Sequence, residues 1–214
     1  MEHSVCLCDP FSNNERTFLM NISFSRNAWS SDDLVYAYSY RFTDRPVFTQ
    51  FDDHIENKAD PAGPGGYEYI SVLSRNQYAA GARITTHCSF EDDGAPLIVL
   101  ADKVYTDPDG YLRFGEYLEV VLYKNGINVW RMWYRGGKVT WKKLMGVQFP
   151  VTTGDQHTLT VETGEEGLQI DADGMKMSVY IPDMYRSFHA GINACEGINR
   201  FYDMTVDGTV TEQI

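Results

Sequence analysis

Apolar and polar residues alternate along most of this chain, and turn-forming residues interrupt the alternation about every 8 to 12 positions. A period of two places successive side chains on opposite faces of a β-strand, whereas a helix needs a period of about 3.6. No helical pattern longer than two turns is present. The predicted strands cover residues 34–41, 67–74, 82–90, 97–102, 117–124, 127–135, 138–144, 157–162, 168–171, 176–181, 188–193 and 199–206. Strands so numerous and short predict an all-β, antiparallel sandwich or barrel.

The size of the chain suits one domain of this class. It has 214 residues, of which 43% are hydrophobic, and no Pro-, Ser- or Gly-rich linker divides it. We therefore predict a single β-sandwich domain over residues 1–214, with residues from 1 to about 33 as an irregular or edge extension. Residues 97–100 are all apolar and predict a central strand. Residues 48–66 predict a long surface loop, a kind of segment that often carries function.

The charge of the chain excludes two classes of partner. The formal net charge is −12, whereas a general nucleic-acid binder needs a basic surface to neutralise phosphates. The same charge disfavours polybasic attachment to a membrane, and no run approaches the roughly 18 to 20 apolar residues of a transmembrane helix. The first residues lack the basic and apolar regions of a signal peptide. We expect a cytoplasmic protein, or a secreted one if a leader has been removed.

Neither the cysteines nor the acidic residues form a recognisable metal motif. The four cysteines are too few and too scattered for a disulfide framework, so we expect free thiols, mostly buried; they are Cys6, Cys8, Cys88 and Cys195. No second Cys or His pair completes a zinc site with Cys6 and Cys8. A structural calcium ion at Asp52, Asp53 and Glu56 is a weak alternative, because no calcium-binding loop motif is present. We expect no cofactor.

The most informative segment lies between Val120 and Gly154, which contains no Asp or Glu. It holds six basic residues, interleaved with four large aromatic ones; they are Lys124, Arg131, Arg135, Lys138, Lys142 and Lys143, with Trp130, Trp133, Tyr134 and Trp141. A basic and aromatic segment in an acidic protein indicates a surface for an anionic or polyhydroxy ligand.

The turn at Asn125 and Gly126 determines which of these side chains share a face. A two-residue Asn-Gly loop pairs Lys124 with Ile127, whereas a three-residue loop with Gly126 in the left-handed region pairs Tyr123 with Ile127. We favour the second register, because it places Glu119 opposite Arg131.

In that register, one face of three neighbouring strands carries a mixture of aromatic and charged residues; they are Tyr117, Glu119, Arg131, Trp133, Arg135, Thr140 and Lys142. The opposite face then belongs to the core; its residues are Leu118, Val120, Trp130, Met132, Tyr134, Val139 and Trp141.

An aromatic plane beside charged donors and an acceptor suits a sugar, whose C–H face stacks on a ring while its hydroxyls need both donors and acceptors. The excess of Arg and Lys further indicates a carboxylated or sulfated sugar, since Arg binds carboxylates through two parallel hydrogen bonds. The predicted ligand-binding residues are Tyr117, Glu119, Arg131, Trp133, Arg135 and Lys142. The alternative interpretation is a solvated strand face whose charges keep the protein soluble.

A second polar row could line the same surface. Alternation in residues 82–90 places Arg83, Thr85 and His87 on one face, and a histidine beside an arginine could act as a base next to a neutralised carboxylate. His189 lies on a later strand and is a further candidate. A histidine among threonines is more often a structural hydrogen-bonding residue. If the protein is an enzyme, the candidate catalytic residues are Arg83, His87, Glu119, Arg131 and His189.

The C-terminal third brings a family into view. The four segments that carry the resemblance are residues 157–162 (HTLTVE), 168–174 (LQIDADG), 188–193 (FHAGIN) and 199–207 (NRFYDMTVD). They resemble the closing strands of concanavalin A-like lectin/glucanase domains, and residues 81–84 and 95–100 look like the central strands of those domains. The resemblance covers about residues 67–208. It implies a jelly-roll sandwich of two antiparallel, curved sheets with a concave ligand-binding face.

The catalytic motifs of that superfamily do not occur in this sequence. Its glucanases carry a Glu-x-Asp-x-(x)-Glu strand whose alternate acids face the cleft, and neither residues 91–93 nor residues 116–119 have that spacing. The Gln-Ile-His and Arg-x-Glu-x-Arg strands of alginate-lyase jelly rolls are also missing.

Three functions therefore stay open, because fold does not determine function. The first is a carbohydrate-binding domain that holds a sugar on its concave face, with uronate-containing sugars among the candidate ligands. The second is a polysaccharide lyase or glycoside hydrolase that uses the same face. The third is a structural or partner-binding sandwich. The sequence does not determine the oligomeric state.

Overall fold

The computed structural model describes residues 17–41, 45–57, 69–91 and 93–214, and these residues form strands, turns and loops without a helix. No helix in this part of the chain is therefore long and apolar enough to cross a membrane. The strands are β1 (Thr17–Ser23), β2 (Leu34–Tyr36), β3 (Tyr38–Ser39), β4 (Thr49–Gln50), β5 (Ile55–Glu56), β6 (Ile70–Ala79), β7 (Arg83–Glu91), β8 (Pro96–Ala101), β9 (Val104–Thr106), β10 (Leu112–Phe114), β11 (Tyr117–Tyr123), β12 (Gly126–Arg135), β13 (Lys138–Gln148), β14 (His157–Gly164), β15 (Gly167–Ala172), β16 (Met175–Tyr180), β17 (Ser187–Ala194) and β18 (Ile198–Gln213).

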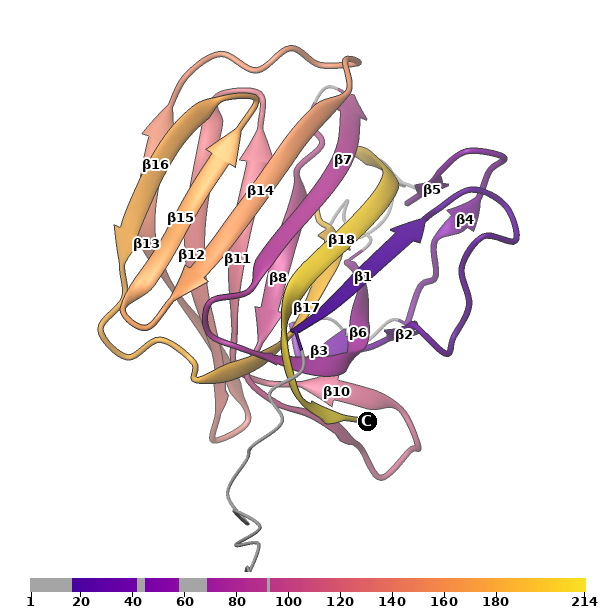
Figure 1. The fold of residues 1–214 in the computed structure, drawn as a ribbon, viewed down its shortest axis with the longest axis vertical. Coiled ribbons are helices and arrows are strands. Elements are labelled where there is room, and N and C mark those ends of the chain that lie inside the picture. The colour runs from indigo at the N-terminus through magenta and orange to yellow at the C-terminus, as the bar shows by residue number, and fades with distance from the viewer. Residues whose placement is uncertain (1–16, 42–44, 58–68, 92) are drawn as a thin grey trace, which may run out of the picture.

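The strands form two packed antiparallel sheets, which confirms the predicted all-β jelly-roll sandwich (Figure 1). The front sheet has the order β1-β18-β7-β14-β15-β16, with β5 and β4 added beside β18. The rear sheet has the order β13-β12-β11-β8-β17-β6-β2. The long strand β18 belongs to both, because Ile198–Asp207 pairs with β7 and the last residues pair with β6.

The main hydrophobic core fills the space between the two sheets. Phe90, Phe188 and Phe201 are each fully buried there, with Ile98 and Leu118 from the rear sheet. Large apolar side chains of this kind each contribute roughly 1.5 to 3 kcal/mol when they leave water. The apolar residues of the alternating pattern therefore point inward from both sheets and form one shared core.

A small third sheet covers part of the outer face of the rear sheet, which is the face turned away from the front sheet. It consists of β3, β10 and β9, with β3 parallel to β10. Phe114 of β10 is fully buried and packs with Leu97, Val99 and Tyr117 in a second hydrophobic cluster. Both faces of β8 are thereby covered, which confirms the prediction of a central strand at residues 97–100.

The structure also tests the predictions for the cysteines, for the first residues of the chain and for the loop at residues 48–66. Cys88 and Cys195 are buried free thiols as predicted, whereas Cys6 and Cys8 lie outside the described residues. Residues 17–23 form β1, which pairs with β18. Part of the predicted 48–66 loop forms the short strands β4 and β5, and residues 58–66 lie outside the described residues.

Candidate functional site

The β11–β12 hairpin has a register that differs from both alternatives considered for the sequence. Tyr123 pairs with Gly126, so the loop consists of Lys124 and Asn125 alone. Glu119 consequently lies opposite Trp130, and the predicted pairing of Glu119 with Arg131 is wrong. A shift of one residue moves every side chain of a strand to the other face of the sheet.

The corrected register redistributes the predicted ligand-binding residues between two faces. Tyr117 and Glu119 lie on the outer face of the rear sheet, where their cross-strand neighbours are Met132 and Trp130. The β12–β13 pairing matches the prediction, with Arg131 opposite Lys142, Trp133 opposite Thr140 and Arg135 opposite Lys138. These residues, however, lie on the opposite face from Glu119, so the six predicted residues do not form one surface.

A hollow of about 280 Å³ opens on the outer face of the rear sheet, over β11, β12 and β13. Its lining includes two carboxyl groups, one cation, one amide and two indole rings; these are Glu119, Glu196, Arg41, Asn128, Trp130 and Trp141. Trp130 is partly buried and packs against the second hydrophobic cluster, whereas the prediction that Trp141 is a core residue is wrong. Trp141 is 61% exposed on the edge strand β13.

Glu119 forms part of the buried lining of this hollow. Only 2% of the residue is exposed, and its Oε1 atom has no hydrogen-bond partner among the described residues. Burial raises the pKa of the Glu119 carboxyl to about 7, and the charge of Arg41 acts in the opposite direction. A buried acceptor without a partner costs about 1 to 3 kcal/mol, and a ligand that donates to it would recover that energy.

Asn128 supplies a second acceptor of the same kind. Its Oδ1 atom is buried without a hydrogen-bond partner, and Asn128 lies on the same face as Glu119, one pair of residues further along β12. The neighbouring position on β13 is Gly146, where an added Cβ would lie 3.0 Å from Oδ1. Because Gly146 has no side chain, the space next to the Asn128 side-chain amide stays open.

Aromatic rings form one wall of the hollow. Trp130 lies opposite Glu119, and the ammonium of Lys143 stands 4.8 Å from the centre of the Trp130 ring. Trp141 is the cross-strand neighbour of Met132 and presents a largely exposed indole. An exposed indole ring beside hydrogen-bonding groups provides the stacking and polar contacts that a sugar ring needs.

Arg131 is buried and held by ion pairs, so its guanidinium does not face solvent. Its Nη2 atom donates to Glu116 Oε1 at 2.8 Å, and its Nη1 atom lies 2.6 Å from Asp183 Oδ2. The guanidinium also stands 5.5 Å from the centre of the Trp133 ring and 5.3 Å from that of Tyr185. Because Asp183 and Tyr185 belong to the loop between β16 and β17, Arg131 ties that loop to β12.

The second predicted row does not reach the hollow. Arg83 and His87 lie on β7 in the front sheet, where Arg83 pairs with Glu162 and His87 Nδ1 lies 2.8 Å from Asp203 Oδ2. The expectation that they share a surface with Glu119 is therefore wrong.

His189 lies on the outer face of the rear sheet, two strands away from Glu119. It is 3% exposed and donates from Nδ1 to the Ser74 carbonyl at 3.1 Å. Burial lowers the pKa of its imidazole.

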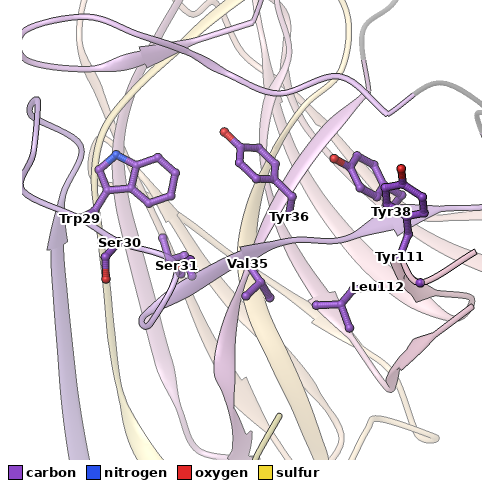
Figure 2. A pocket seen from close by; sticks show the side chains of 10 residues that line it. Trp29, Ser30, Ser31, Val35, Tyr36, Tyr38, Tyr111 and Leu112 are labelled. Carbon is purple, nitrogen blue, oxygen red and sulfur yellow. The ribbon is translucent and has the colours of Figure 1, made fainter.

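A second hollow of about 510 Å³ lies beside β2 (Figure 2). Trp29, Tyr36, Tyr38 and Tyr111 line it, and none of the described lining residues is charged, although the Arg45 guanidinium stands 3.4 Å from the centre of the Tyr111 ring. Two of its polar groups already have partners: Trp29 Nε1 donates to Gln50 Oε1 at 2.8 Å, and the Tyr36 hydroxyl accepts from the Phe48 amide at 3.2 Å. This hollow therefore gives weaker evidence of a ligand than the Glu119 hollow.

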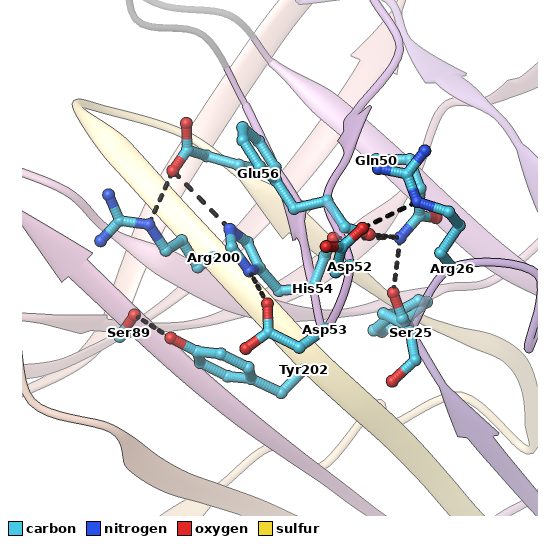
Figure 3. A network of polar contacts seen from close by, with 12 residues as sticks. Ser25, Arg26, Gln50, Asp52, Asp53, His54, Glu56, Ser89, Arg200 and Tyr202 are labelled. Carbon is cyan, nitrogen blue, oxygen red and sulfur yellow. Dashed lines mark hydrogen bonds and ion pairs between the residues drawn. The ribbon is translucent and has the colours of Figure 1, made fainter.

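The acidic residues considered for calcium take part in a network of ion pairs (Figure 3). Asp52 pairs with Arg26 at 2.9 Å, and Asp53 Oδ1 lies 2.6 Å from His54 Nδ1. Glu56 Oε2 lies 2.6 Å from the Nε atom of Arg200. Three or more metal-ligating side chains do not gather anywhere in the described part of the chain.

Comparison with solved structures identifies the fold. β-Agarase A from Zobellia galactanivorans superimposes with a TM-score of 0.64 at 13% identity, over 90% of this chain and 93% of that one. The κ-carrageenase from Pseudoalteromonas carrageenovora, in complex with an oligotetrasaccharide of κ-carrageenan, gives 0.58 at 10% identity, over 96% and 100%. The exoplasmic/lumenal domain of VIP36, bound to Ca²⁺ and Man3GlcNAc, gives 0.57 at 12% identity, over 90% of each chain.

The protein thus has the concanavalin A-like lectin/glucanase fold, as the sequence resemblance implied. No family model and no curated protein matches the sequence. Glycoside hydrolases and lectins share this fold, so its presence alone does not decide between catalysis and binding. On the outer face of β11, Glu119 is accompanied by Tyr117, Val121 and Tyr123, so this strand presents one carboxyl group instead of a row of alternate acids.

Proposed function

We propose that this protein binds an oligosaccharide in the hollow beside Glu119. The observation that carries the proposal is the buried carboxyl oxygen of Glu119, which has no hydrogen-bond partner among the described residues and lies next to Trp130. A sugar hydroxyl would donate to this oxygen while the sugar ring stacks on an indole. The fold supports the proposal, because solved structures with the same fold contain bound oligosaccharides.

The position of the cations bears on whether the sugar is acidic. The expectation of a uronate-containing ligand used Arg131, Arg135 and Lys142, which lie on the other face of the sheet. The cations beside the hollow are Arg41 and Lys143. An acidic group on a ring of the oligosaccharide other than the one beside Glu119 would therefore meet these two side chains.

The test is a glycan array followed by calorimetric titration of the oligosaccharides that bind. We expect Trp141→Ala to weaken binding at least about tenfold, since stacking of a sugar ring on an exposed indole contributes roughly 1.5 kcal/mol. The matched control is Tyr180→Ala on β16 of the front sheet, because Tyr180 is also exposed, at 69%. Equal affinity of the Trp141→Ala variant and the unmodified protein would contradict this site.

A polysaccharide-degrading enzyme is the second candidate, and one observation favours it. Burial raises the pKa of Glu119 to about 7, which suits a general acid, and Glu196 supplies a second carboxyl group in the same hollow. Incubation with agarose, carrageenan and polyuronates tests this candidate by the release of reducing ends and of ultraviolet-absorbing unsaturated ends. Activity that Glu119→Gln abolishes would establish the enzyme, whereas binding without any product would exclude it for these substrates.

A further inference from the structure

The two unpartnered acceptors of the hollow define what kind of sugar it can hold. Glu119 Oε1 and Asn128 Oδ1 are both buried and find no hydrogen-bond partner in the described part of the chain, and neither atom can donate a proton when Glu119 is ionised. Glu119 and Asn128 are diagonal neighbours across β11 and β12, a separation of roughly 7 to 8 Å between their backbones. A single sugar ring can extend over that distance with two hydroxyl groups.

We propose that the hollow selects an uncharged sugar ring, two of whose hydroxyl groups donate to Glu119 and Asn128. This inference rests on the proposed carbohydrate-binding function and goes further, because it excludes acidic rings from the hollow. Glu119 and Asn128 both need a hydrogen-bond donor from the ligand. A carboxylate or sulfate on the sugar ring can only accept, so it would leave them without a partner. A site built to accept from a hydroxyl rejects ligands that cannot donate, because its buried groups are then left without partners.

The surroundings of Glu119 allow this selectivity to be measured through pH. The charged and titratable groups around Glu119 come from four places in the fold: Arg41 follows β3, Tyr123 ends β11, Lys143 of β13 stands over the Trp130 ring, and Cys195 and Glu196 follow β17. Burial raises the pKa of the Cys195 thiol to about 12, so this thiol stays neutral near pH 7. The variant Glu196→Gln measures the contribution of Glu196.

The direction of the pH dependence follows from the chemistry of the acceptor. An ionised carboxylate accepts a hydroxyl hydrogen bond more strongly than a neutral carboxyl group does. Affinity for a neutral sugar should therefore rise as pH increases through about 7, where Glu119 ionises. An acidic ring would show the opposite trend, because ionised Glu119 repels it.

The experiment compares a neutral agarose oligosaccharide with an oligogalacturonate of equal length, which carries a carboxylate on every ring. Calorimetric titration at pH 5 and pH 8 is made with the unmodified protein and with Glu119→Gln, Asn128→Ala and Glu165→Gln. The last variant is a matched control, because Glu165 is exposed in the turn between β14 and β15. We expect the agarose oligosaccharide to bind at least about tenfold more tightly than the oligogalacturonate at pH 8.

The variants make the expected pattern specific to the two acceptors. At pH 8, Glu119→Gln should weaken agarose oligosaccharide binding about 10- to 100-fold, whereas at pH 5 it should bind like the unmodified protein. Asn128→Ala should lose roughly 5- to 10-fold at both pH values.

Three results would overturn the inference. Tighter binding of the oligogalacturonate, or pH-independent binding of the agarose oligosaccharide, would do so while leaving the proposed function standing. Binding of neither compound would also overturn it, and the proposed function would then be decided separately by the glycan array.

Discussion

At the scale of single residues, the main correction concerns Arg131. The sequence suggested a ligand-binding cation, because basic residues in an acid-free segment of an acidic protein indicate an anion site. The structure instead gives this guanidinium two carboxylate partners, Glu116 and Asp183. Glu116 precedes β11 and reaches Arg131 through the β11–β12 hairpin, whose register the sequence misjudged, whereas Asp183 comes from a loop 52 residues away that local composition could not reveal.

This environment predicts a role in stability. The Arg131 side chain is 9% exposed, whereas those of its partners Glu116 and Asp183 are 25% and 72% exposed, so replacing Arg131 removes a partly buried pair and costs about 1 to 3 kcal/mol. We expect Arg131→Ala to lower the free energy of unfolding in urea by about that amount. Arg135→Ala should cost less than about 1 kcal/mol, since the side chain of Arg135 is 75% exposed. Equal urea midpoints for the two variants would show that Arg131 is not a structural anchor.

Glu119 should make stability depend on pH in an unusual direction. Its pKa is about 7 in the folded protein and 4.5 in the reference state, so between these values the folded state binds more protons than the unfolded state. The contribution of Glu119 is therefore most favourable below pH 4.5 and is lost as pH rises through 7. The full loss amounts to about 3 kcal/mol.

Comparison with Glu119→Gln isolates this effect from the other titrating groups. The variant should gain about 3 kcal/mol relative to the unmodified protein between pH 4 and pH 8. Urea unfolding at both pH values measures the difference, and a difference that stays constant would mean that Glu119 ionises normally in the folded protein.

At the scale of elements, the sequence predicted strands well and one hairpin register wrongly. The predicted strands at 117–124 and 127–135 correspond closely to β11 and β12, because alternation and turn residues are local signals. The register depends on where Gly126 lies in the hairpin, and that position is determined by its contact with the neighbouring strand β13. Gly126 is the first residue of β12, where an added Cβ would lie 2.1 Å from the Val147 carbonyl oxygen of β13. The absence of a side chain at Gly126 thus lets β13 pack closely against β12. Gly126 is therefore part of the strand, and the loop consists of Lys124 and Asn125.

This role of Gly126 can be tested by comparison with Gly136, which lies in the turn between β12 and β13. Both Gly126 and Gly136 have positive φ, at 126° and 58°, but a Cβ on Gly136 would meet nothing within 4 Å. Gly136→Ala should therefore cost about 1 to 2 kcal/mol of backbone strain alone. Gly126→Ala adds a backbone clash and should cost at least about 3 kcal/mol in urea unfolding. Similar costs would indicate that β13 does not need this close approach.

At the scale of the whole molecule, the two sheets are tied together in two ways. They share the hydrophobic core, to which Ile98 of the rear sheet and Phe90 of the front sheet both belong. They also share β18, which pairs with β7 and then with β6. Neither sheet can separate without exposing the core face of the other, and on this basis we propose that the chain forms a single domain.

We therefore expect one cooperative unfolding transition, as for a single domain with one core. The positions of the tryptophans make this testable: Trp130, Trp133 and Trp141 lie on β12 and β13 of the rear sheet, whereas Trp29 contacts Phe24 and Gln50 at the front sheet. In a Trp29→Phe variant, fluorescence therefore reports on the rear sheet. Far-ultraviolet circular dichroism reports on both sheets. Urea transitions followed by tryptophan fluorescence and by circular dichroism should coincide. If fluorescence changes at lower urea, the rear sheet opens first, and the shared core and β18 do not couple the two sheets into one unit.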